Sequence, residues 1–408
     1  MKSFRSKTGN IVAGLGARAV VVTGAYVAAT VAVLLTVIVL RGAVSPQLLR
    51  NLLGFIFIAS LAAGLEPGTI KAAALGEAGV DGAALASYLG VGALKGALAS
   101  PFLAILWRLA DPTLPVPVLA WTPVITIAGF CATDLRVLLD LRGRYALAVG
   151  LKQGSLAGGV ALVGLLLVLK APLVWAIGVS SLIRLGVLPL AMAFAGDPPR
   201  GGAFWTDARR LLRDSRWLDL AAVSLIAAVG GSVDRMIGLR LLGPSDYSAY
   251  YLIYEVFTKF WLVSYILGPI LFARQATGTG VETFVRGAFG LTVAAGAGFL
   301  AVVAGVLAFG PGLLARVVGA SFGWATFAFA VGVVIGAFVQ LWIAQLQGAG
   351  QGRRTAVAMA LSAAVSAPVF WIAAGRFGAE GLLWAFLAKT ALELAMVAWR
   401  GRTVGIAD

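Results

Sequence analysis

The chain has 408 residues, of which 60% are hydrophobic and 12% charged, and its mean hydropathy is +0.96. This balance excludes a soluble domain, and the continuous apolar stretches predict a polytopic helical membrane protein rather than a β-barrel, whose strands alternate. The net charge is +15, histidine is absent and Cys131 is the single cysteine, so the sequence offers no disulfide, no zinc or haem site, and no Ser-His or Cys-His catalytic pair.

The apolar stretches recur along the whole chain, and a window of about 20 residues per span predicts about twelve transmembrane helices. The N-terminal segment MKSFRSKTGN is basic, but the apolar run after it is too long for a signal-peptide core, so we expect the first helix to be retained. The predicted helices lie at 17–40, 51–66, 83–106, 117–134, 146–169, 172–195, 218–241, 248–272, 286–309, 323–347, 356–374 and 380–399.

The longest polar stretch, residues 196–217, follows the sixth predicted helix and divides the chain into two halves. We therefore expect an N-terminal six-helix lobe at 1–195, a basic linker at 196–217 and a C-terminal six-helix lobe at 218–408. Because six is even, both lobes start on the same side of the membrane, which permits two parallel repeats. Lys and Arg gather in the loops on the side of the membrane where the N-terminus lies. This bias predicts that both termini and the linker are cytoplasmic and that the protein lies in the inner membrane.

Residues 230–274 organise the rest of the chain, since they read as one membrane helix, a tight turn at 243–246 and a second membrane helix. A charge at bilayer depth costs several kcal/mol, so charges inside these helices are expected to serve a function. Asp234-Arg235 and Glu255 lie about equally far below the outer ends of their helices, which permits pairing across the hairpin. A pair between Glu255 and Lys259, four residues apart on one helix, is the alternative.

Basic side chains inside the predicted spans are the candidates for binding substrate. Lys95 and Arg184 have no acidic residue within one turn, so we expect them to be uncompensated. Uncompensated cations near the midplane imply a positive, water-filled cavity that suits an anionic substrate. The candidates for binding substrate are Lys95, Arg184, Arg235, Lys259 and Lys389, and the candidates for charge pairing or ion coupling are Asp234, Glu255 and Glu393.

Aromatic residues cluster at 247–265. Tyr247 to Tyr251 are interpreted as an aromatic belt at the outer interface. Tyr254, Trp261 and Tyr265 lie deeper, where they could stack against sugar rings.

Residues 232–256, SVDRMIGLRLLGPSDYSAYYLIYEV, resemble the start of the second half of Wzx-type oligosaccharide and O-antigen flippases, from the superfamily that includes the MATE exporters. The shared pattern is a small residue, Asp-Arg, an apolar run, Leu-Gly-Pro and a stretch rich in Ser and Tyr. GLEPGTIKAAAL at 64–75 is similar to the end of the family's second helix, whereas RGAVSP at 41–46 replaces the usual Leu-Gly-Pro.

The resemblance implies a MATE-like fold and a flippase that moves a sugar unit on polyprenyl diphosphate to the outer leaflet for cell-surface polysaccharide synthesis. The expected partners are this lipid-linked anionic glycan, membrane lipids and other polysaccharide-assembly proteins, with no nucleic acid, cofactor or metal. An ion-coupled efflux transporter of the same superfamily is the first alternative, but it would need an acidic first-half pocket. A polysaccharide polymerase is the second, but the short external loops hold no catalytic domain. The sequence also lacks a P-loop, so neither ATP drive nor enzymatic activity is expected.

Overall fold

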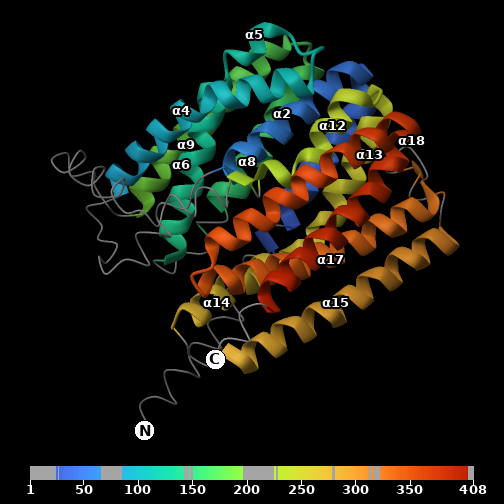
Figure 1. Cartoon of the computed structure of the whole chain (residues 1–408). Helices are drawn as coiled ribbons and strands as arrows, with labels where there is room; N and C mark the ends of the chain where they lie inside the picture. The colour runs from blue at the N-terminus through green and yellow to red at the C-terminus, as the bar shows by residue number, and fades with distance from the viewer. Residues whose placement is uncertain are drawn as a thin grey trace. The chain divides into compact units, whose positions relative to one another are not determined.

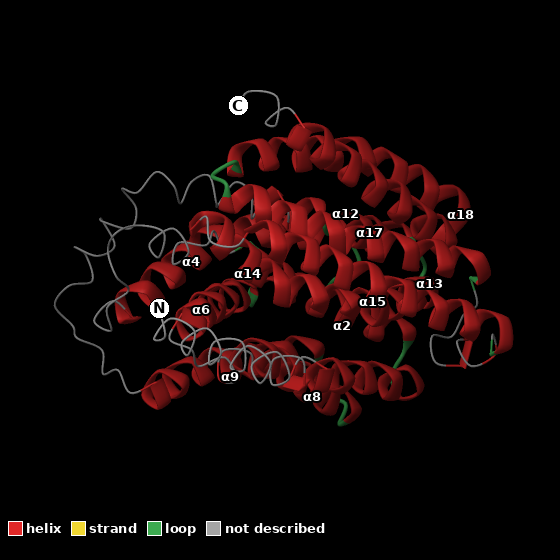
Figure 2. Cartoon of the chain, turned by 90° about the horizontal axis from the view of Figure 1, so that it is seen from below, coloured by secondary structure: helices red, strands yellow, loops and turns green. Residues whose placement is uncertain are grey.

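The computed structural model describes residues 24–65, 85–141, 150–195, 225–277, 281–310 and 322–402, apart from residues 26 and 227, together with residues 147, 312, 315 and 316. Within these ranges every regular element is a helix, as Figures 1 and 2 show. The predicted linker at 196–217 lies outside the described residues.

The chain forms two compact units, and their division does not follow a single cut in the sequence. The first unit comprises Met1–Val44, Ile58–Arg108 and Leu114–Trp217, and the second comprises Ser45–Phe57, Leu109–Thr113 and Leu218–Asp408. Two short pieces of the predicted N-terminal lobe therefore belong to the second unit. The division into lobes at 1–195 and 218–408 stays a prediction.

The first unit consists of apolar helices, and α9 packs against both α6 and α8. One face of α4 exposes Leu94, Leu98, Phe102 and Ile105, which recur at intervals of three and four residues. An apolar stripe of this kind is matched by the hydrocarbon of a membrane. The helices with residues in this unit are Val27–Ala43, α2 (Pro46–Gly64), α4 (Leu85–Ala110), α5 (Val116–Leu119), α6 (Thr122–Leu141), η2 (Gly150–Gly154), α8 (Ser155–Val168) and α9 (Leu173–Ala195); α2 and α4 also contribute residues to the second unit.

The second unit is built around α17, which packs against α14, α15 and α18. Figure 1 shows α15 running beside α17. Gly378 has a φ of 61°, which interrupts α18 and separates its two helical parts. The elements of this unit are α12 (Val233–Leu241), α13 (Pro244–Phe257), η3 (Thr258–Trp261), α14 (Leu262–Thr277), α15 (Val281–Phe309), α17 (Gly323–Gly348) and α18 (Gly352–Arg402).

Seven helices in the described ranges are long and apolar enough to cross a membrane, and three shorter apolar helices accompany them. Eleven of the twelve predicted membrane spans overlap these helices, and the seventh, at 218–241, overlaps none of them in the described residues. The longest span, Gly352–Ala398, covers the two predicted helices at 356–374 and 380–399, because the break at Gly378 lies between them. The chain is therefore an all-helical, multi-pass membrane protein, as the sequence predicts.

Candidate functional site

The two helices of the charged hairpin are both irregular at the positions that carry the charges. Turn residues Gly231 and Ser232 precede α12, so the seventh predicted span is interrupted just before Asp234. The eighth span passes from α13 through the 3₁₀ turn η3, which contains Lys259, into α14. Interrupted helices at membrane depth occur where the backbone is buried in protein or lines a cavity, and transporter binding sites commonly use them.

Arg235 on α12 is the cation at the first of these breaks. Its Nη2 donates to the Gly231 carbonyl (3.2 Å) and to Ser232 Oγ (2.9 Å), so the guanidinium satisfies polar groups that the interrupted helix leaves available. Its Cζ also lies 4.5 Å from the centre of the Tyr254 ring and 5.1 Å from that of Phe57. No carboxylate lies within ion-pair distance of Arg235 in the described part of the chain. Two aromatic rings therefore stabilise this cation without neutralising it.

Asp234, the neighbour of Arg235, is fully buried and accepts a hydrogen bond at Oδ2 from the hydroxyl of Tyr250. Its other oxygen, Oδ1, has no hydrogen-bond partner among the described residues. The pairing of Asp234-Arg235 with Glu255 across the hairpin, which the sequence permits, does not occur among the described residues. A tyrosine one turn closer to the start of α13 reaches Asp234, and Glu255 is engaged on its own helix.

The remaining candidate charges of the second unit form two ion pairs, each within a continuous stretch of helical residues. Lys259 pairs with Glu255, the same-helix alternative that the sequence leaves open. Lys389 Nζ lies 3.2 Å from Glu393 Oε1 and 5.7 Å from the centre of the Phe386 ring. Both pairs place their partners four residues apart, so neighbouring helices are not needed to form them.

Lys95 in the first unit is not uncompensated, which corrects the sequence-based expectation. Its Nζ lies 3.7 Å from Asp134 Oδ2, and the two side chains are 12% and 2% exposed. Lys95 is on α4 and Asp134 is on α6, so the partner comes from a different helix. The lack of an acidic residue within one helical turn of Lys95 therefore does not mean that its charge is uncompensated, because the partner comes from another helix.

Arg184 on α9 differs from Lys95 because it has no ion-pair partner among the described residues. It is 5% exposed, and its Nε and Nη1 have no hydrogen-bond acceptor there. Its aliphatic stem lies against α8 at Gly159, where an added Cβ would be 2.9 Å from Arg184 Cδ and 2.9 Å from Ser180 Oγ. Ser180 in turn donates to the Gly159 carbonyl (2.9 Å). A buried guanidinium with unused donors is the arrangement that an anion would complete.

The tyrosines of α13 do not form the expected interfacial belt. Tyr247, Tyr250 and Tyr251 are at most 2% exposed, so they pack inside the protein. Tyr254 is also buried, and its ring packs at right angles to Trp261 with centroids 6.4 Å apart. Trp261 Nε1 donates to the Val333 carbonyl (2.8 Å), so this indole is held by protein contacts. Tyr265 is 45% exposed.

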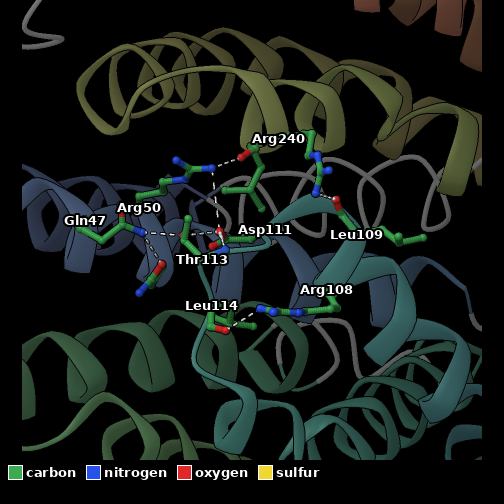
Figure 3. A network of polar contacts seen from close by, with 10 residues as sticks. Gln47, Arg50, Arg108, Leu109, Asp111, Thr113, Leu114 and Arg240 are labelled. Carbon is green, nitrogen blue, oxygen red and sulfur yellow. Dashed lines mark hydrogen bonds and ion pairs between the residues drawn. The ribbon is translucent and has the colours of Figure 1, made fainter.

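A polar network that the sequence did not reveal joins α2 to the end of α12, and Figure 3 shows it. Arg50 is buried; its Nη2 donates to the Leu239 carbonyl and lies 3.8 Å from Asp111 Oδ1. Asp111 Oδ1 also accepts a hydrogen bond from Thr113 Oγ1 (2.6 Å). Arg240 Nη1 donates to the Leu109 carbonyl (3.2 Å). These contacts explain why residues 45–57 and 109–113 belong to the second unit.

Comparisons with known proteins identify the fold. No family model and no curated protein matches the sequence. Among solved structures, a mutant of the Vibrio cholerae MATE transporter VcmN has a TM-score of 0.69 at 13% identity, with 99% of each chain covered. The eukaryotic MATE transporter AtDTX14 has a TM-score of 0.65 at 15% identity, covering 98% of this chain and 96% of its own. The lipid II flippase MurJ, in an inward closed conformation, has a TM-score of 0.67 at 10% identity, covering 94% and 87% respectively.

The chain therefore has the fold shared by MATE transporters and the MurJ flippase, and the predicted MATE-like fold class is confirmed. The five candidate cations are distributed over both units: Lys95 and Arg184 in the first, and Arg235, Lys259 and Lys389 in the second. A single chamber that they line together stays a prediction.

Proposed function

We propose that this protein is a flippase for a polyprenyl-diphosphate-linked oligosaccharide, which it moves from the inner to the outer leaflet of the cytoplasmic membrane by alternating access. Both termini would be cytoplasmic, and other polysaccharide-assembly proteins would supply and consume the lipid-linked glycan. The observation that carries this proposal is Arg184, a buried cation with no ion-pair partner among the described residues and with two unused donor groups.

A buried guanidinium without a counter-charge is costly, and burying its N–H groups without acceptors adds to that cost. Substrate binding would recover this free energy if the substrate brings negative charge and acceptor oxygens. A diphosphate supplies both, and the planar fork of arginine fits phosphate oxygens in bidentate geometry. A cationic drug would instead be repelled by Arg184.

The second unit supports an anionic substrate in a different way. Arg235 keeps its positive charge because aromatic rings and neutral acceptors contact it instead of a carboxylate within ion-pair distance. It lies beside a helix interruption, where transporters commonly place their binding groups. Lys95, Lys259 and Lys389 have acidic partners, so their contribution to binding would be weaker than that of Arg184 and Arg235.

The structural neighbours allow a second candidate function, ion-coupled efflux of small molecules. The MATE transporters VcmN and AtDTX14 support it through the shared fold. Asp234 also favours it, because a buried carboxyl with one unpartnered oxygen suits the binding of a coupling ion. Another neighbour, a superfamily transporter from Pyrococcus furiosus (TM-score 0.55, 16% identity, 97% of this chain and 96% of that one), is described as having a binding pocket of reverse polarity that suggests a different function. Pocket polarity therefore separates the two candidates.

The deciding experiment measures transport in proteoliposomes containing a fluorescent polyprenyl-diphosphate-linked sugar. Accessibility to a membrane-impermeant quencher reports its leaflet. We expect the wild type to flip the sugar lipid, Arg184→Ala and Arg235→Ala to reduce the rate at least tenfold, and Arg184→Lys to restore it only in part. Arg286→Ala is the matched control, because that arginine is exposed and paired with Glu282.

The same proteoliposomes, loaded with a fluorescent organic cation, test the efflux candidate. Export of the cation without movement of the sugar lipid would establish efflux instead. If Arg184→Ala and Arg235→Ala flip the sugar lipid at the wild-type rate with normal insertion, the anion-binding role of both cations is wrong.

A further inference from the structure

The second unit contains a groove between α14 and α15 that none of the groups considered above uses. Its volume is about 350 Å³, within the range of roughly 300–1,000 Å³ that is usual for ligand sites. Apolar side chains form its wall, namely Leu267 from α14 and Phe284, Ala288 and Leu291 from α15. The three residues of α15 are spaced by four and three positions, so they lie along one face and the groove follows the helix axis.

One end of the groove is polar. Arg274, in the last turn of α14, and Thr283, in the first turn of α15, belong to its lining. The guanidinium of Arg274 lies over the Phe284 ring, with Cζ 4.7 Å from its centre. Because α14 ends at Thr277 and α15 begins at Val281, this polar end lies at the helix ends, where a membrane has its headgroups.

We propose that this groove binds an anionic glycerophospholipid of the surrounding membrane. One hydrocarbon chain would lie along the apolar wall, and the phosphate would contact Arg274 and Thr283. The groove has the same division as such a lipid, with a cationic end at headgroup depth and an apolar body below it. Arginine is suited to phosphate because it donates two parallel hydrogen bonds to phosphate oxygens.

The acidic residue beside this end of the groove forms an ion pair. Glu282 is the acidic residue in the first turn of α15, and its Oε1 accepts a hydrogen bond from Arg286 Nη2 (2.6 Å). The pair offsets the charge of the carboxylate that directly precedes Thr283, and Arg274 is the basic residue of the groove lining.

The groove also has room for a chain. An added Cβ at Gly287, which belongs to the lining, would have no atom within 4 Å. A Cβ at Gly287 therefore meets no protein atom, and we expect a larger side chain there to extend into the groove. Gly298, farther along α15, has the same open surroundings and is outside the groove. The same substitution at Gly287 and at Gly298 changes α15 in the same way, but only the one at Gly287 places a side chain in the groove.

The test is native mass spectrometry of the purified full-length protein with phosphatidylglycerol and phosphatidylcholine at equal concentration. We expect the wild type to retain one phosphatidylglycerol at least tenfold more strongly than phosphatidylcholine. Arg274→Gln should abolish the preference, whereas Arg353→Gln, at an exposed arginine outside the groove, should retain it. Gly287→Leu should reduce retention of both lipids, and Gly298→Leu should not.

Equal binding of the two lipids by the wild type would overturn the assignment. So would the same loss in Arg274→Gln and Arg353→Gln, or the same loss in both glycine variants. A competition experiment with polyprenyl phosphate distinguishes a membrane phospholipid from the transported lipid as the source of the bound phosphate. If polyprenyl phosphate displaces the retained phosphatidylglycerol one for one at lower concentration, the groove is a site for the transported lipid and the phospholipid assignment is wrong. The proposal does not rest on flippase activity, since lipid retention is measured without transport.

Discussion

Lys95 and Asp134 form an ion pair between α4 and α6 of the first unit, with Lys95 Nζ 3.7 Å from Asp134 Oδ2. Both side chains are largely enclosed by protein. The pair reduces the excess positive charge of the first unit, and Arg184 is left as its buried basic residue without a carboxylate partner in the described ranges. The two cations should therefore respond differently to substitution.

Removing Lys95 alone should destabilise the protein more than removing both partners. Lys95→Met breaks the ion pair with the buried Asp134 carboxylate, for which we expect a loss of about 3–5 kcal/mol in the free energy of unfolding. Lys95→Met combined with Asp134→Leu should recover most of that loss, because neither charge remains. Thermal unfolding in detergent measures the difference. Equal stability of the single variant and the wild type would show that the pair has no structural role.

Gly159 should control the position of Arg184. In Gly159→Ala the new methyl group would lie 2.9 Å from Arg184 Cδ and from Ser180 Oγ, so the arginine stem must move, at a cost of about 1–3 kcal/mol. Gly158→Ala is the matched control, since an added Cβ there meets no atom within 4 Å. We expect Gly159→Ala to lower both stability and flipping of the sugar lipid, and Gly158→Ala to preserve both. Identical behaviour of the two variants would contradict the packing of Arg184 against α8.

The architecture could be predicted from the sequence because hydropathy acts locally. Each apolar run of sufficient length must satisfy its own backbone hydrogen bonds as a helix in the membrane, whatever its neighbours are. Ion pairs within one helix, such as Lys389–Glu393, are equally local and could be recognised by their spacing. The break between the predicted helices at 356–374 and 380–399 was also predictable. It occurs at Gly378, whose positive φ interrupts the helix.

Contacts between helices could not be predicted in this way. The pairs Lys95–Asp134, Asp234–Tyr250 and Arg50–Asp111 each join residues from different segments of the chain. A single sequence contains no distance information for such pairs. The burial of Tyr247 was missed for the same reason, because an aromatic residue near a helix start suits either a membrane interface or a protein core.

Two tyrosines of α13 should differ in their contribution to stability although both are fully buried. The Tyr250 hydroxyl donates to Asp234, whereas the Tyr247 hydroxyl has no hydrogen-bond partner among the described residues. Tyr250→Phe should therefore cost about 1–3 kcal/mol, since it leaves a buried carboxylate with one fewer donor. Tyr247→Phe should be neutral or slightly stabilising. The two variants are compared by thermal unfolding, and a larger loss for Tyr247→Phe would exclude this hydrogen bond.

Positions 353 and 376 should label from opposite sides of the membrane. They lie in the first part of α18, roughly 35 Å apart along a helix, which exceeds a hydrocarbon core of about 30 Å. Both arginines are exposed. In a Cys131→Ala background, an impermeant maleimide added to intact cells should label Arg376→Cys and not Arg353→Cys, since the predicted orientation places residue 353 in the cytoplasm. The reverse pattern would invert the proposed topology.

Asp234, rather than Glu255, should carry the coupling proton if transport is driven by a proton gradient. Glu255 is paired with Lys259, so its charge is already used within the helix. Asp234 is fully buried, is held by Tyr250 at one oxygen and has no partner at the other in the described structure, which suits a group that alternates between charged and neutral forms. We expect Asp234→Asn to bind the sugar lipid but to lose the response of flipping to an imposed pH gradient. Glu255→Gln should keep that response at a lower rate, because the ion pair with Lys259 is lost. Proteoliposomes with the gradient applied in either direction measure both variants, and an unchanged response in Asp234→Asn would remove this carboxyl as the coupling group.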